Sequence, residues 1–144
     1  PIFSKDSKET LTAIEKLQSF INTYPESEYI SEANELVFDL DFRLEMKAYD
    51  TAFQYNTLTD YQASIKAFDN FILDFPGSKL REKAMYYRFD SSYRFAINSV
   101  SWKMQDRINK AISHYNSFKK NYESSEFINE ADLKLNELNE LKTI

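Results

Sequence analysis

The stretch from Ser64 to Phe89, SIKAFDNFILDFPGSKLREKAMYYRF, decides the fold because its pattern occurs three times in the chain. The first copy begins at Ala13, 51 residues earlier (64 − 13), and the third begins at Ala111, 47 residues later (111 − 64). Four columns are identical in all copies: Ile14, Ile65 and Ile112; Phe20, Phe71 and Phe118; Ser27, Ser78 and Ser125; Ala33, Ala84 and Ala131. Such a period indicates an array of similar structural units.

Each copy has the pattern of a helix, a tight turn and a second helix. In the first copy a small residue and three bulky ones, at positions 13, 17, 20 and 24, are spaced to share one helix face. Pro25 and Pro76 end the first helix of their copies, because proline has no N–H for the helical ladder. Glu123 replaces that proline in the third copy, where a turn is still predicted.

The repeated serines are predicted to cap the second helix of each copy. Thr59 and Gln62 are predicted to form a capping box at the start of the third helix, about 60–75. The repeated alanines mark places where the helix crosses a neighbour too closely for a larger side chain. The predicted helices span about 7–24, 28–57, 60–75, 79–99, 102–122 and 126–142. Apolar residues on two sides of the long second helix predict that it packs between two neighbours.

Repeated helical hairpins that cannot bury their own apolar faces predict a stacked array. The order of small, bulky and proline positions resembles the second helix of a tetratricopeptide (TPR) repeat. The expected fold is all-α, with TPR-like helical hairpins stacked as a right-handed α-solenoid of about six helices. We expect residues 1–144 to form a single domain of about three hairpins and to be a fragment of a longer chain.

Composition narrows the classes of partner and chemistry. The 144 residues carry a formal charge of −5, which argues against a nucleic-acid partner. There is no cysteine, so disulfides and cysteine-based metal sites are excluded. No apolar run approaches the ~20 residues of a membrane span.

The sequence predicts no enzymatic activity, no cofactor and no metal site. His114 is the only histidine, and we expect its face to meet solvent. No Gly-rich phosphate loop or metal-ligand pattern is present. Protein recognition is the better hypothesis.

The candidate partner-binding residues are cations and aromatics, since Arg, Tyr and Trp dominate interface energetics. Trp102, the single tryptophan, either anchors a partner with Lys103 beside it or packs the corner of a hairpin. Arg88 and Arg94, near Tyr87, are either part of a binding face or arginines whose stems pack on the surface. The complete predicted set is Arg43, Leu44, Lys47, Tyr87, Arg88, Arg94, Trp102 and Lys103.

Several segments together resemble the BamD family, the TPR lipoproteins of the machine that assembles outer-membrane β-barrels. They are Ala13 to Ala33, Arg43-Leu44-Glu45, Lys47-Ala48-Tyr49, Asp60-Tyr61-Gln62-Ala63, and Tyr93 to Ser99 followed by Lys103 and Arg107. The similarity covers nearly the whole chain and corresponds to the C-terminal three repeats of the family, in a form similar to Bacteroidetes-type members.

The resemblance implies a non-enzymatic scaffold at the periplasmic face of the bacterial outer membrane. It implies protein partners, among them a POTRA domain of BamA, and membrane attachment only through a lipid anchor that this chain does not contain. Arg43-Leu44 matches a family Arg-Leu pair implicated in the BamA contact. The alternative is a general TPR adaptor that captures an extended peptide in its concave groove.

Overall fold

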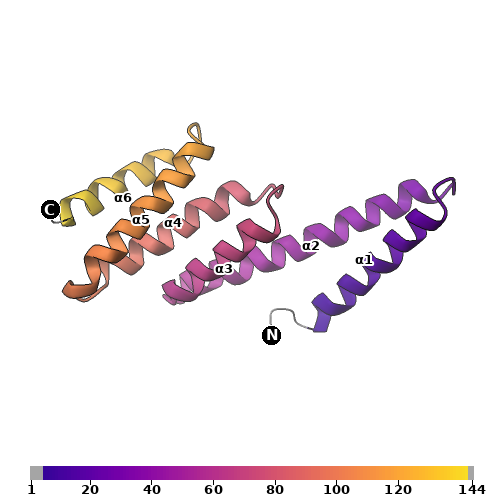
Figure 1. Cartoon of the computed structure of the whole chain (residues 1–144), viewed down its shortest axis with the longest axis horizontal. Coiled ribbons are helices and arrows are strands. Elements are labelled where there is room, and N and C mark those ends of the chain that lie inside the picture. The colour runs from indigo at the N-terminus through magenta and orange to yellow at the C-terminus, as the bar shows by residue number, and fades with distance from the viewer. Residues whose placement is uncertain (1–4, 143–144) are drawn as a thin grey trace. The chain divides into compact units, whose positions relative to one another are not determined.

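The computed structural model describes residues 5–142, and side chains from Ser7 onward, as an all-helical chain (Figure 1). The expectation of an all-α fold of TPR-like helical hairpins is confirmed. Within the described residues the helices are α1 (Lys5–Thr23), α2 (Ile30–Thr57), α3 (Tyr61–Asp74), α4 (Arg81–Ile97), α5 (Ser101–Asn121) and α6 (Ile128–Leu141).

The turns that join α1 to α2, α3 to α4 and α5 to α6 have the same geometry. In the middle copy, the N–H of Phe75 donates to the Phe71 carbonyl, and the N–H of Ser78 donates to the Phe75 carbonyl, at 2.9 and 3.1 Å. The Ser78 Oγ accepts from the N–H of Leu80 at 3.0 Å. The same bonds recur around Ser27 and Ser125. The repeated columns therefore specify one local structure, including the copy that lacks proline.

Two predictions of helix starts need correction. Each repeated serine caps the turn that leads into the second helix, which begins three residues later, at Ile30, Arg81 or Ile128. The cap of α3 is Asp60, whose carboxylate accepts from the N–H of Ala63, and not Thr59. Thr59 takes a left-handed conformation with φ 62°, which places it in the turn before the helix.

The chain divides into two compact units, residues 1–47 and 48–144. In the first, α1 and the N-terminal part of α2 form an antiparallel hairpin (Figure 1). The buried apolar residues among its described positions are Ile14, Ala33 and Leu44. Phe38 and Met46 of α2 are 60% and 43% exposed, so the predicted packing of this part of α2 on both sides is wrong.

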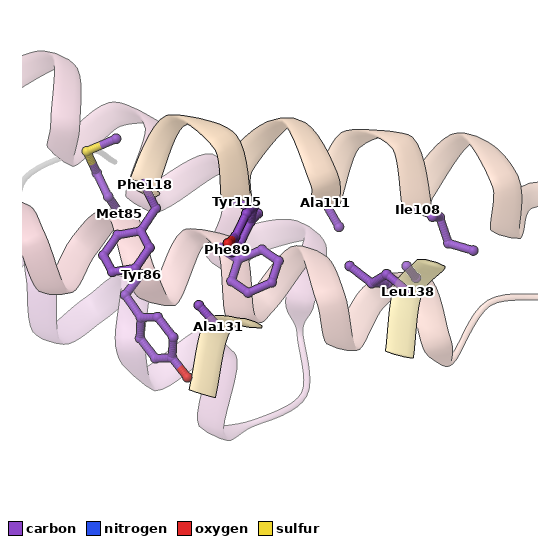
Figure 2. Packing of buried hydrophobic residues seen from close by; sticks show 10 residues of the cluster. Met85, Tyr86, Phe89, Ile108, Ala111, Tyr115, Phe118, Ala131 and Leu138 are labelled. Carbon is purple, nitrogen blue, oxygen red and sulfur yellow. The ribbon is translucent and has the colours of Figure 1, made fainter. Parts of the chain in front are cut away.

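The second unit contains the larger core. Helix α4 packs against α3, α5 and α6, and Figure 2 shows Tyr86 and Phe89 of α4 facing Tyr115 and Phe118 of α5. The repeated alanines Ala84 and Ala131 are completely buried. The close-crossing role predicted for this column agrees with that burial.

A buried polar network also crosses the second unit. The carboxylate of Asp90, 2% exposed, accepts from Lys134 at 2.7 Å, from the Arg94 Nε at 2.8 Å and from the Asn56 amide at 3.1 Å. Ser64, which stands where the other copies have alanine, donates to the Ala52 carbonyl at 2.8 Å and lies 2.9 Å from the Ser91 Oγ. These contacts join α2, α3, α4 and α6.

Candidate functional site

A groove with a volume of about 580 Å³ lies between α3 and α5 in the second unit. Gln62, Ile65, Lys66 and Asp69 of α3 form one wall. The other wall is formed by α5 residues from Trp102 to His114, and Ser92 and Phe95 of α4 lie between the walls. We call this surface the α3–α5 groove. Its lining residues are Gln62, Ile65, Lys66, Asp69, Ser92, Phe95, Trp102, Lys103, Asp106, Arg107, Lys110 and His114.

The groove is cationic, although the chain as a whole is acidic. Four lysine and arginine side chains line it against two aspartates, which leaves a formal charge of +2 (4 − 2) with His114 neutral. Asp69 is already paired, because its carboxylate accepts from the Arg88 guanidinium at 2.9 Å. Among the described residues, Lys66 and Lys110 take part in no ion pair.

An aromatic side chain stands at the end of the groove nearest the N-terminus of α5. Trp102 is 78% exposed, so it does not pack a hairpin corner, which was one of its two predicted roles. The Lys103 ammonium lies 4.7 Å from the centre of the Trp102 ring, within the distance of a cation–π contact. Farther along, Arg107 covers the Phe95 ring at 3.8 Å and donates to the Ser99 Oγ at 2.7 Å.

His114 lies in the wall of this groove, partly buried, where sequence analysis expected it to face solvent. Burial is the main cause that lowers its pKa, to about 4, and the nearby Arg88 and Lys110 cations act in the same direction against the opposing effect of Asp69. The imidazole is therefore neutral at physiological pH and can donate or accept a hydrogen bond.

The sequence-predicted residues of the second unit fall into two groups. Trp102 and Lys103 line the groove. Tyr87, Arg88 and Arg94 belong to α4 and have partners inside the molecule. The Tyr87 ring packs on Phe53 with centroids 4.9 Å apart, and Arg88 and Arg94 pair with Asp69 and Asp90. The Arg88 side chain is 13% exposed and the Arg94 side chain 46%.

The predicted residues Arg43, Leu44 and Lys47 belong to the first unit. Arg43 and Lys47 are exposed one turn apart on α2, and with Ser7 and Thr10 of α1 they line a hollow of about 210 Å³. Leu44 is buried and 9% exposed. A partner at this surface would meet the two cations, while Leu44 packs the hairpin beneath them.

The prediction missed most of the groove's own cations. Lys103, Arg107, Lys110 and His114 are spaced i, i+4, i+7 and i+11, which places them along one face of α5. This spacing was the sequence signal that could have predicted a cationic face on α5. Lys66 of α3 has no comparable signal, because only the packing of both helices on α4 brings it opposite the stripe.

Within residues 5–142, no group of three or more His, Cys, Asp or Glu side chains is arranged to hold a metal ion. None of the helices described for this chain has the length and apolar character needed to cross a membrane.

Comparison with known proteins gives one family. The profile of the YfiO family, described as outer membrane lipoprotein, matches residues 2–66 and again residues 43–142. The two matches overlap and together span nearly the whole chain. No protein of curated function matches.

Proposed function

Because the chain belongs to the YfiO family of outer membrane lipoproteins, we propose that it is a non-enzymatic scaffold subunit in the assembly of outer-membrane β-barrel proteins. The observation that supports this is the family match across residues 2–142, which agrees at family level with the resemblance to BamD. In this proposal the chain acts at the periplasmic face of the outer membrane and corresponds to the C-terminal repeats of a Bacteroidetes-type member.

The proposed partner is a POTRA domain of BamA, bound through the surface around Arg43 and Lys47. Both side chains are exposed on α2, and the buried Leu44 between them fixes this part of α2 within the hairpin. Two cations one turn apart on a helix suit an acidic patch on a folded domain, because charge complementarity sets orientation and speeds association.

The test is a titration of the 144-residue chain with the POTRA domains of BamA from the same organism. We expect saturable binding that Arg43→Glu weakens by about tenfold, or about 1.4 kcal/mol, with unchanged helix content by circular dichroism. Lys16→Glu is the matched control, since Lys16 is exposed on α1 of the same unit. Absence of binding by the folded chain, or equal weakening by both variants, would count against the proposed partner.

The α3–α5 groove favours a second candidate function, an adaptor that captures an extended peptide. Its residues belong to the second unit, whereas Arg43 and Lys47 belong to the first. A short peptide alone should then bind, and changes in the groove should weaken binding more than Arg43→Glu does. The two candidates therefore make separate predictions.

A further inference from the structure

We propose that the α3–α5 groove binds an extended acidic peptide segment of a partner protein and holds an aromatic side chain of that segment against Trp102. This inference rests on the adaptor candidate above and names the chemistry of its ligand. It does not depend on binding at Arg43 and Lys47.

Charge is the first argument. The groove carries a formal +2 on a chain of −5, so its formal charge is opposite in sign to that of the protein as a whole. Arg107 is held by Ser99 and Phe95, which leaves Lys66, Lys103 and Lys110 as the cations best able to meet a ligand. A concave surface with an excess of one sign of charge attracts ligands of the opposite sign.

The length of the groove is the second argument. From Trp102 to His114 the α5 wall rises by about 18 Å at ~1.5 Å per residue. That distance fits about five residues of extended chain at ~3.3 Å each. The volume of about 580 Å³ lies inside the range of roughly 300–1,000 Å³ that is typical of ligand sites.

The third argument is the exposure of Trp102. A tryptophan that is 78% exposed, in the first turn of a helix and beside a lysine, leaves a large apolar surface uncovered. Aromatic residues of this kind supply much of the free energy of protein association. The positive end of the α5 dipole lies at the same end of the groove and favours a nearby carboxylate.

The polar groups of the groove favour a peptide over a nucleic acid. Asp106, Gln62 and Ser92 all offer hydrogen-bond acceptors, and the backbone N–H groups of a peptide are donors that a phosphodiester backbone lacks.

The test uses the intact 144-residue chain and a short blocked peptide, Glu-Asp-Phe-Glu-Glu, with Gln-Asn-Phe-Gln-Gln as the neutral control. Because Trp102 is the only tryptophan, its fluorescence reports directly on the groove. We expect the acidic peptide to shift the emission to the blue and to protect Trp102 from acrylamide quenching. The neutral peptide should bind at least about tenfold more weakly, and added salt should weaken the binding of the acidic peptide.

Variants then locate the site. The double variant Lys103→Glu, Lys110→Glu should bind the acidic peptide about tenfold or more weakly. Lys120 is exposed on the same helix outside the groove, so Lys120→Glu should leave the affinity for the peptide unchanged. Arg43→Glu should also leave peptide binding unchanged, so failure here is distinguishable from failure of the POTRA proposal. If the double variant loses helix content, the affinities of the natural chain for the two peptides, and their dependence on salt, still test the inference.

Three outcomes would overturn the inference. They are equal affinity for the neutral peptide, equal weakening by Lys120→Glu, and binding of a single-stranded oligonucleotide as tightly as the acidic peptide. The last would define a general polyanion site in place of a peptide site.

Discussion

At the scale of single residues, His114 shows how position in the array changes an ordinary side chain. Arg88 of α4, Asp69 of α3 and Lys110 of α5 face it, and burial in the groove wall is the main cause of its lowered pKa. It is the only histidine, so an NMR titration of the imidazole needs no assignment. We predict a midpoint near 4, and a midpoint at the ordinary value of about 6.5 would show that the groove is open to water there.

The same shift has a consequence for stability. In the unfolded chain His114 takes up a proton at about pH 6.5, whereas the folded chain holds it neutral down to about pH 4. Between these values the unfolded state binds more protons, so the free energy of unfolding falls as the pH falls. Urea unfolding of the natural chain and of His114→Gln should show a shallower pH dependence in the variant.

Residue-scale prediction from sequence succeeded where a column repeats and failed where a position is defined by three helices. Ala84 and Ala131 were expected at close crossings and are completely buried. His114 sits beside the core positions Ile112 and Tyr115 in sequence, which says nothing about the groove that α3 and α4 build around it.

At the scale of elements, the turn between α5 and α6 can be compared directly with the turn that contains Pro76. Tyr122, the residue before Glu123, has φ −141° and ψ 58°. Phe75, the residue before Pro76, has nearly the same conformation, with φ −128° and ψ 60°. Glu123 therefore occupies a backbone site that already accepts proline in the middle copy. We predict that Glu123→Pro raises the free energy of unfolding by about 0.4–1 kcal/mol, because proline restricts the unfolded chain.

Chemical denaturation of both chains measures this difference. Asn121→Pro is the matched control, because Asn121 is the last residue of α5, where proline removes a helical hydrogen bond and clashes with the preceding turn. That control should be destabilised. A destabilised Glu123→Pro would show that the two turns differ despite their shared hydrogen bonds.

The helices themselves were largely predictable, because proline, serine and apolar spacing act locally. Their starts were less so: the bulky columns do not reveal that residues after each serine complete a turn before the helix begins. The sequence shows apolar residues on two sides of α2, but Phe38 and Met46 are exposed, so the packing predicted from that pattern was wrong for this part of the helix. A sequence pattern shows which faces are apolar and not which of them are covered.

At the scale of the whole molecule, the two units differ in how much apolar surface they bury. The first has three buried apolar side chains among its described residues, whereas the second contains two buried clusters. Local opening requires less free energy where fewer apolar contacts are buried. We predict that amides of α1 exchange with deuterium faster than those of α4 and α5, as hydrogen-exchange mass spectrometry can measure, and equal protection would contradict this.

The Asp90 network has a further consequence for how such a chain can evolve. The equivalent positions in the other copies are Asp39 and Glu137, also acidic, yet both are exposed, and only Asp90 meets a lysine in the next hairpin. Duplication or exchange of hairpins at this point would remove the Lys134 contact and leave Asp90 with Arg94 of its own helix and the Asn56 amide of α2. The middle hairpin is therefore adapted to the hairpin that follows it, and it is not interchangeable with the other two.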